Sequence, residues 1–207
     1  MRRTVIFDLG GVYFSDGTRQ AIDKITAGYG VDRQAVAGFL NGEAGASYRT
    51  GRITVDQFWQ QATTLWKIQA SATELSTTWC ECYQPNRGTV YLVKLLRAAD
   101  HQILYLSDNT KERVAYLEEK YGFLKNFDDG VFSHLARLKK PDPMIYELVL
   151  AKAFNPAAAC LYIDDKPDYL NPARDLGMQV IAFKNASQLE ADLAKLALLP
   201  ENYKTNR

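Results

Sequence analysis

Short apolar segments alternate with helix-like segments through most of the chain, and this rhythm constrains the fold more than any other feature. Strands are predicted at residues 3–7, 102–107, 130–133, 159–163 and 179–183. Helices are predicted at residues 110–121, 141–154, 169–176 and 187–197. The strands are apolar on both faces, which is typical of a parallel sheet that is covered on both sides. We therefore expect an α/β fold with helices on both faces of a parallel sheet.

Residues 16–85 break this rhythm, because they read as helices only. Helices are predicted here at residues 18–29, 33–40, 55–67 and 72–83, with a glycine-rich turn at 41–51. Thr54 with Gln57, and Ser71 with Glu74, have the spacing of a capping box at a helix start. An all-helical insert after the first strand indicates a small second domain. We predict a Rossmann-like core of residues 1–15 and 86–207, and a helical cap of residues 16–85.

The composition and the charge limit the classes of partner. The 207 residues have a formal net charge of +1, which gives no electrostatic reason to expect nucleic acid or an acidic membrane surface as partner. The apolar runs are of strand length, far below the roughly 20 residues of a membrane span. The N-terminal segment lacks the apolar stretch of a secretion signal, and the three cysteines fit free thiols in a reducing compartment. We expect a cytoplasmic protein that acts on a small molecule, and nothing in the sequence determines its oligomeric state.

Polar side chains stand at the ends of several predicted strands. Asp8 follows the first strand, Ser107 ends the second, and Asp164 and Asp165 end the fourth, while Lys140 lies directly before a predicted helix. In an open parallel sheet, ligands bind beyond the carboxyl ends of the strands, where the loops meet. We therefore expect these five side chains to form one site.

Several carboxylates at one point require a counter-charge. Close carboxylate pairs among Asp8, Asp108, Asp164 and Asp165 would repel one another by about 1–4 kcal/mol each, which Lys140 alone cannot offset. A hard divalent cation can, and Mg²⁺ suits a site with two or three protein oxygens and room for water and phosphate. The sequence therefore predicts a Mg²⁺ site that receives a small-molecule phosphate ester. The alternative is that these acidic residues cap helices or face solvent separately.

Four segments resemble, in order, the motifs of the haloacid dehalogenase-like hydrolase superfamily, in the group with a helical cap after the first motif. They are FDLGGV at 7–12, LYLSDN at 104–109, KKPDPMIY at 139–146 and YIDDKPDYLNPARDLGM at 162–178. The stretch from Lys140 to Met178 is similar to bacterial sugar-phosphate phosphatases and to the N-terminal phosphatase domain of epoxide hydrolases. The resemblance implies a Mg²⁺-dependent phosphatase.

The resemblance also implies the metal ligands and the nucleophile. Asp8 would attack phosphorus and bind the metal, and the backbone carbonyl of Gly10 would be a second ligand. Asp165 would be the direct side-chain ligand, with Asp164 close behind it. A carboxylate that attacks phosphorus forms an acyl phosphate, which water then cleaves.

Substrate-binding roles follow from the same resemblance. Ser107 would hold the phosphoryl group, and Lys140 would neutralise the nucleophile and the phosphate. Asn109 is a candidate to supply an amide to the phosphate. Gly11, next to Gly10, lets the backbone turn sharply and approach the ligand closely.

Two positions depart from the pattern of the resembling phosphatases. Gly10 stands where a second aspartate usually acts as general acid and base, so a leaving group of low pKa, or Asp16 acting through a water, would have to compensate. Asp108 stands where asparagine is frequent, so Asp108 points away, or Asn109 supplies the amide, or phosphate is not the natural ligand. Two alternative functions stay open: a catalytically weak binding or regulatory protein of the same fold, and a 2-haloacid dehalogenase, which needs no metal.

Substrate identity is expected to lie in the cap. Phe14, Asp16, Tyr48 and Arg49 are predicted near the entrance of the site. Arg49 is a candidate to meet a second anionic group of the substrate, and a solvated surface position is the alternative.

Overall fold

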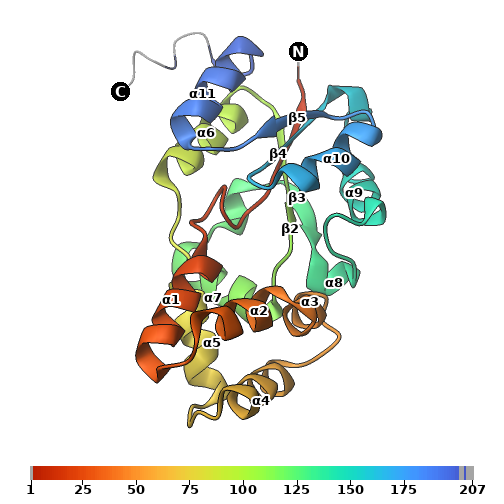
Figure 1. Cartoon of the computed structure of the whole chain (residues 1–207). Coiled ribbons are helices and arrows are strands. Elements are labelled where there is room, and N and C mark those ends of the chain that lie inside the picture. The colour runs from red at the N-terminus through yellow and green to blue at the C-terminus, as the bar shows by residue number, and fades with distance from the viewer. Residues whose placement is uncertain (1, 201–202, 204–207) are drawn as a thin grey trace.

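A five-stranded parallel sheet lies among helices in the upper part of the molecule as Figure 1 shows it. The computed structural model describes residues 2–200 and 203. The strands are β1 (Thr4–Phe7), β2 (Gln102–Ser107), β3 (Asp129–Phe132), β4 (Cys160–Asp164) and β5 (Gln179–Ala182), in the spatial order β3-β2-β1-β4-β5. Every neighbouring pair is parallel. The predicted α/β class is therefore confirmed, and each predicted strand is found within one or two residues of its expected ends.

Helices cover both faces of this sheet. They are α6 (Arg87–Ala98), α7 (Lys111–Tyr121), α9 (Pro143–Leu150), α10 (Pro167–Asp175) and α11 (Ala186–Lys195). Alternate residues of a strand point to opposite faces. Val5 and Phe7 of β1 belong to a buried cluster with α6 and α11, whereas Ile6 belongs to a second buried cluster with α9 and α10. Because both faces of β1 are buried, the strand reads as a continuous apolar run in the sequence.

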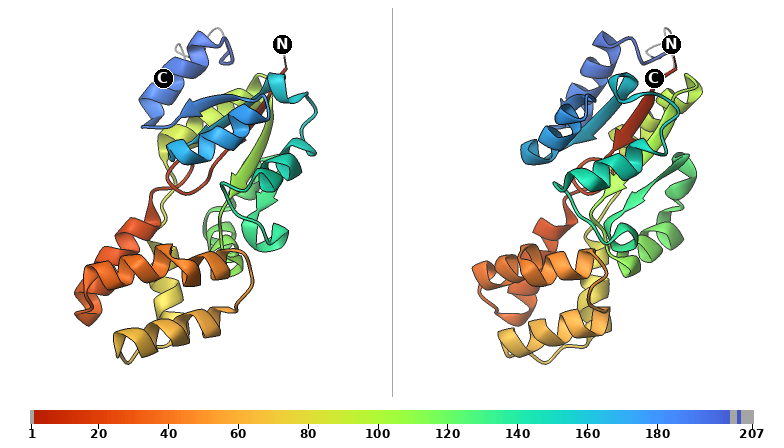
Figure 2. Two further views of the ribbon diagram at one scale, coloured as in Figure 1. Left: turned by 45° about the vertical axis from the view of Figure 1, so that its right-hand side comes forward. Right: turned by 90° about the vertical axis from the view of Figure 1, so that its right-hand side faces the viewer.

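A group of helices lies together at one end of the sheet in all three views (Figures 1 and 2). They are α1 (Gly17–Tyr29), α2 (Arg33–Asn41), α3 (Glu43–Arg49), α4 (Val55–Trp66) and α5 (Ala72–Glu81). Helix α5 contacts α7, which follows β2, and α3 contacts α8 (Ser133–Ala136), which follows β3. These contacts place the helices beyond the carboxyl ends of the strands, and we propose that residues 16–85 form a cap on a core of residues 1–15 and 86–207.

The helix starts in this segment follow local rules, but one predicted turn is wrong. Thr54 and Gln57 form a reciprocal capping box, and the hydroxyl of Ser71 accepts a hydrogen bond from the backbone N–H of Glu74. Residues 43–49, which lie within the predicted turn, form helix α3 instead. A Cβ atom at Gly45 would lie 1.9 Å from the carbonyl oxygen of Leu40. The glycine therefore lies in a helix, and it lets α3 approach the end of α2 closely.

Helix α9 ends earlier than predicted because a distant side chain binds the backbone beyond it. The helix ends at Leu150, although the prediction extended it to residue 154. The side chain of Gln102 accepts a hydrogen bond from the N–H of Phe154 at 2.8 Å and donates one to the carbonyl of Lys152 at 2.9 Å. A strand residue thus replaces the helical partners of these groups.

The structure bears on two further expectations, which concern membrane-spanning helices and cysteine thiols. Among the described residues, no helix is long and apolar enough to cross a membrane. All three cysteines are free thiols, as predicted, and the structure shows that all three are buried.

Candidate active site

Asp8 lies at the topological switch point of the sheet, where the order of the strands reverses. The chain passes from β1 to β2 and β3 on one side of the sheet, then to β4 and β5 on the other. The N–H of Asp8 donates to the carbonyl of Ile163 at 2.9 Å, so Asp8 is anchored where β1 and β4 end. Its side chain is buried. Crevices at such switch points are the usual ligand sites of open α/β sheets.

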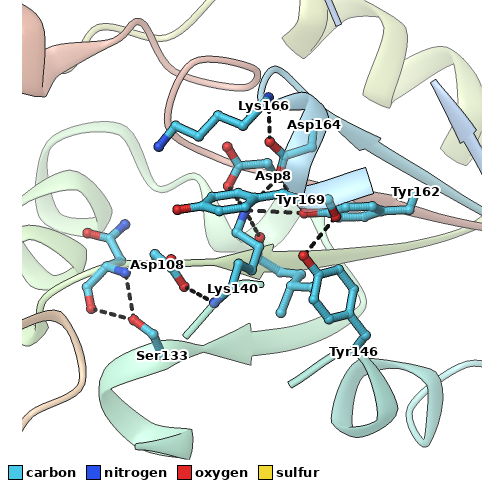
Figure 3. A network of polar contacts seen from close by, with 11 residues as sticks. Asp8, Asp108, Ser133, Lys140, Tyr146, Tyr162, Asp164, Lys166 and Tyr169 are labelled. Carbon is cyan, nitrogen blue, oxygen red and sulfur yellow. Dashed lines mark hydrogen bonds and ion pairs between the residues drawn. The ribbon is translucent and has the colours of Figure 1, made fainter. Parts of the chain in front are cut away.

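The ammonium group of Lys140 connects the acidic residues of this crevice (Figure 3). Its Nζ atom lies 2.8 Å from Oδ1 of Asp8 and 2.7 Å from Oδ2 of Asp164, and it donates to the carbonyl of Leu106 at 3.3 Å. Burial alone would lower the pKa of Lys140, but the carboxylates of Asp164 and Asp8 outweigh it and hold that pKa well above its usual range. Lys140 is therefore a fixed positive charge beside Asp8.

Both carboxyl oxygens of Asp164 are bound by the protein itself. Oδ2 accepts hydrogen bonds from Lys140 and from the hydroxyl of Tyr162, and Oδ1 accepts one from the backbone N–H of Lys166 at 2.9 Å. These bonds hold the ammonium group of Lys140 and the loop after β4 in place. The geometry gives Asp164 a positioning role.

Asp165, in contrast, has an oxygen without a partner. Among the described residues, its Oδ1 atom is buried and accepts no hydrogen bond. Carboxyl oxygens of Asp8, Asp164 and Asp165 lie within 4.8 Å of one another. Burial raises the pKa of Asp165, and the charge of Asp164 raises it further. An unpaired buried carboxylate oxygen is costly unless a ligand binds it, so this set of oxygen donors fits a hard divalent cation.

Burial also disfavours the charged form of Asp8. It raises the pKa of Asp8 to about 7, since the attraction of Lys140 offsets burial and the repulsion of Asp164 only in part. A cation next to Asp8 would favour the ionised form that a nucleophile requires. The positive charge that the protein itself places beside Asp8 is therefore too small to keep its pKa at the usual value.

The loop after β2 is held by hydrogen bonds within the protein. Oδ1 of Asp108 accepts a hydrogen bond from the backbone N–H of Lys140 at 3.1 Å, so this carboxylate is tied to the Lys140 segment. The side-chain oxygen of Asn109 accepts hydrogen bonds from Thr110 and Arg113. Ser107 is buried at the end of β2.

A cavity of about 590 Å³ extends from these residues to the proposed cap. Asp8, Gly10, Asp108, Lys140 and Asp165 line it from the core. The other predicted site residues, Gly11, Ser107, Asn109 and Asp164, lie next to lining residues in the chain without being among those that line the cavity.

Two of the four predicted entrance residues line the cavity and two do not. Asp16 and Arg49 line it. Phe14 is instead buried in an aromatic cluster, in which its ring centroid lies 5.2 Å from the ring centroid of Phe123. Tyr48 stacks on Phe58 at 4.5 Å. Their apolar rings are taken up by core packing, which the sequence pattern did not separate from an entrance position.

Several residues near the site were not predicted as site residues from the sequence. Tyr162 donates to Asp164, and its position inside an apolar strand predicted only burial. The ring of Tyr169 lies 5.0 Å from Nζ of Lys140. Arg113 donates to the hydroxyl of Tyr83 at 2.9 Å, and both residues line the cavity. Only the tertiary structure joins Tyr83 to Arg113, because Tyr83 follows α5 whereas Arg113 lies in α7.

Comparison with known proteins identifies a hydrolase family and relatives that are named as a phosphatase and a hydrolase. A family model described as a haloacid dehalogenase-like hydrolase matches residues 2–177. The sesquiterpene phosphatase astK of Aspergillus oryzae is 24% identical over 180 residues, which cover 85% of this chain and 87% of that protein. Flavin mononucleotide hydrolase 1 of Arabidopsis thaliana is 35% identical over 66 residues, which cover 32% of this chain and 27% of that protein.

Solved structures share the fold at low sequence identity. A HAD family enzyme from Bacteroides thetaiotaomicron, in complex with magnesium and inorganic phosphate, has a TM-score of 0.73 at 18% identity, covering 89% of this chain and 96% of that chain. The L-2-haloacid dehalogenase of Xanthobacter autotrophicus, with chloropropionic acid covalently bound, has a TM-score of 0.66 at 18% identity, covering 97% of this chain and 85% of that chain. These likenesses concern the fold alone.

Proposed function

Since the chain belongs to the haloacid dehalogenase-like hydrolases, we propose that it is a Mg²⁺-dependent phosphatase that hydrolyses a small phosphorylated metabolite. Asp8 would be the nucleophile, and an aspartyl phosphate would be the intermediate. The observation that carries the proposal is the pairing of Asp8 with the buried ammonium group of Lys140, 2.8 Å away, beside the unpaired buried oxygen of Asp165.

The reaction would run in two displacement steps at phosphorus. An oxygen of the Asp8 carboxylate forms a bond to phosphorus, and the bond from phosphorus to the ester oxygen breaks with its electron pair. Water then attacks the aspartyl phosphate, which releases inorganic phosphate and restores the Asp8 carboxylate. Throughout, the charge of Lys140 offsets negative charge on Asp8 and on the phosphoryl oxygens.

Asp8, Asp165 and the backbone carbonyl of Gly10 would hold the Mg²⁺ ion. When bound, the ion supplies positive charge that stabilises the phosphoryl oxygens in the transition state. Asp164 is bound to Lys140, Tyr162 and Lys166, and we assign it the positioning of Lys140. Ser107 and Asn109 are kept as proposed contacts of the phosphoryl group, together with Gly11 in the nucleophile loop.

Two features of the cavity narrow the substrate class. Gly10 provides no side-chain acid, which favours leaving groups of low pKa, such as an anomeric sugar phosphate or an acyl phosphate. Among the described lining residues, aliphatic side chains come only from Ile22, Ala37 and Ala46, whereas most others are charged or polar. A small polar phosphate ester therefore fits this cavity better than the sesquiterpene named for the Aspergillus relative. A cytoplasmic location and the lack of a nucleic-acid partner stay predictions.

A panel of phosphate esters, assayed with Mg²⁺ and with a chelator, tests the proposal. We expect hydrolysis of p-nitrophenyl phosphate and acetyl phosphate that requires Mg²⁺ and falls by at least about 10³-fold in Asp8→Asn, since the variant lacks the nucleophile. Asp100→Asn is the matched control, because Asp100 pairs with Arg2 on the surface, with its side chain 81% exposed.

Three other outcomes would contradict the proposal. Turnover that persists in Asp8→Asn would remove Asp8 as nucleophile. Intact Mg²⁺ binding without turnover of any ester would indicate a binding or regulatory protein. Metal-independent release of halide from 2-haloacids would indicate a dehalogenase.

A further inference from the structure

Two arginines from different parts of the chain face the same cavity as Asp8. Arg49 ends α3 in the proposed cap, and Arg113 lies in the first turn of α7 in the core. Both line the cavity. The guanidinium carbon of Arg113 lies 4.7 Å from the ring centroid of Trp79, and that of Arg49 lies 5.5 Å from the same centroid. One indole thus contacts both cations.

Neither arginine forms an ion pair with an acidic side chain. Among the described residues, no carboxylate lies within 4.0 Å of a nitrogen of Arg49 or of Arg113. Arg33, which also lines the cavity, differs from them because its Nε atom lies 2.9 Å from Oδ1 of Asp23. Charged groups that are buried without a counter-ion are costly. An anion bound between core and cap would remove this cost.

The protein positions both groups through neutral acceptors and leaves donors free. Arg49 donates from Nη1 to the carbonyl of Leu40 at 2.9 Å. Arg113 donates from Nε to Asn109 and from Nη1 to the hydroxyl of Tyr83. A guanidinium group has five N–H donors, so most donors of Arg49 and several of Arg113 stay available to a ligand. These bonds and the indole of Trp79 hold the guanidinium groups in place.

The charge of the whole cavity favours a ligand with more than one anionic group. Among the described lining residues, seven are basic and four are acidic. The guanidinium carbons of Arg49 and Arg113 lie 5.5 and 4.7 Å from the centroid of the same ring of Trp79, which brings the two cations close enough to act on one anion. Burial lowers the pKa of Arg49, and the positive charge of Arg113 lowers it further, while Tyr83 and Asp108 act in the opposite direction. Asp8 and Lys140 already form a separate charge pair at the core end of the cavity.

We propose that Arg49 and Arg113 form a subsite for a second oxyanion of the substrate, either a phosphate or a carboxylate. This oxyanion would lie at the end of the substrate away from the phosphoryl group that Asp8 attacks. The inference rests on the proposed phosphatase function and specifies its substrate class. The arginine pair would bind the second anion through forked N–H donors, which suit both oxyanions. The substrate would be a bisphosphate or a phosphorylated carboxylic acid small enough for a cavity of about 590 Å³.

Matched substrate pairs test this subsite. The phosphate arm compares glucose 1,6-bisphosphate with glucose 1-phosphate, and the carboxylate arm compares glucuronic acid 1-phosphate with glucose 1-phosphate, so that each substrate keeps an anomeric leaving group. We expect wild type to prefer the doubly anionic member of at least one pair by about tenfold or more in kcat/KM. Arg49→Gln and Arg113→Gln should each reduce this ratio by at least about tenfold, and Arg49→Lys should restore part of it, because lysine keeps the charge without the fork.

Arg52→Gln is the control for the loss of a cap arginine, because Arg52 is exposed and does not line the cavity. Arg113 is only 2% exposed, so the Arg113→Gln protein is first checked for folding. Arg49 is half-buried, and Arg49→Gln therefore provides a second variant that is expected to fold. A ratio near one in wild type would overturn the subsite. An equal loss for both members of each pair would also overturn it, because the arginines would then act on the reacting phosphoryl group.

A binding measurement separates this inference from the proposed function. Calorimetric titration of Asp8→Asn with the same substrate pairs, in Mg²⁺, requires no turnover. Tighter binding of the doubly anionic member, lost in Asp8→Asn combined with Arg49→Gln, would support the subsite even if wild type hydrolysed no ester. Equal affinities within both pairs would reject the subsite even if the phosphatase activity were present.

Discussion

Lys140 and Asp164 form the closer of the two ion pairs at the centre of the site, with Nζ of Lys140 2.7 Å from Oδ2 of Asp164 and 2.8 Å from Oδ1 of Asp8. Asp164 therefore holds the same ammonium group that contacts Asp8 (Figure 3). The neighbouring carboxylate of Asp165 has no such role, because its buried Oδ1 atom accepts no hydrogen bond from the described residues. The two adjacent aspartates thus differ in their hydrogen-bond partners.

The first prediction concerns these two aspartates. Asp165→Asn should weaken Mg²⁺ binding by at least about tenfold, because it removes a charged oxygen ligand. Asp164→Asn should affect Mg²⁺ binding less and should lower kcat, because Lys140 loses its anchoring charge. Calorimetric Mg²⁺ titrations and turnover of p-nitrophenyl phosphate measure the two effects. Equal losses of Mg²⁺ affinity in both variants would contradict the division of roles.

The second prediction concerns Gly11, which packs against Asp165. Gly11 has a φ of +97°, and a Cβ atom there would lie 2.5 Å from Oδ2 of Asp165. Gly11→Ala should therefore displace Asp165 and reduce Mg²⁺ affinity by about tenfold or more, with a loss of about 1–3 kcal/mol in stability from backbone strain. Gly10→Ala is the control, since its Cβ atom would meet Tyr83 at an ordinary 3.5 Å. Similar Mg²⁺ affinities in the two variants would contradict this account.

The third prediction restores a general acid at Gly10. The space at this position accepts a Cβ atom, so Gly10→Asp can be accommodated at the start of its side chain. Gly10→Asp should increase turnover of alkyl phosphates relative to p-nitrophenyl phosphate, by part of the about 10²–10⁴-fold that general acid catalysis supplies. Gly10→Asn, which has the same size but no acid, should show no such increase. If Gly10→Asn gave the same gain, proton donation would not be its cause.

The fourth prediction concerns pH and His101. Nδ1 of this buried side chain accepts from the N–H of Arg3 at 3.0 Å, and Nε2 lies 3.1 Å from the carbonyl of Leu198, which fits the neutral ring. Burial lowers the pKa of His101 below its usual 6.5. The unfolded state therefore binds more protons below about pH 6.5, and stability falls as the pH drops, by at most about 1.4 kcal/mol per pH unit.

Thermal denaturation between pH 7.5 and 5 measures this effect. His101→Gln, which keeps a donor and an acceptor, should show a shallower loss of stability than wild type. Burial also lowers the pKa of His134, so His134→Gln measures the contribution of this second histidine to the pH dependence of stability. Identical pH dependence in wild type and His101→Gln would show that His101 does not contribute.

The arrangement of the core and the approach of the main charged residues could be predicted from the sequence. Strands that are apolar on both faces require a parallel sheet between helices, and the carboxyl ends of parallel strands meet at one edge. That rule placed Asp8 beside Asp164 and Asp165, and their carboxyl oxygens lie within 4.8 Å of one another. The helix starts at Thr54 and Ser71 follow from local hydrogen bonds that a few residues determine.

Other features depend on contacts between segments that are distant in the chain. Helix α9 ends where it does because Gln102 binds the backbone beyond it. Phe14 lies in the aromatic core although it follows Asp8 closely in the chain. In each case a short-range pattern allows several outcomes, and packing selects one of them.

What the sequence by itself determined is the class of fold, the strand-end position of Asp8 and the excess of carboxylates beside it, because periodicity and strand direction act locally. Only the tertiary structure decided which hydrogen-bond partners the two aspartates after β4 have. It also decided that Arg49 and Arg113 contact the same indole ring of Trp79. The physical reason is that hydrogen bonds and charge pairs act over a few ångströms, and only folding brings these side chains within that range.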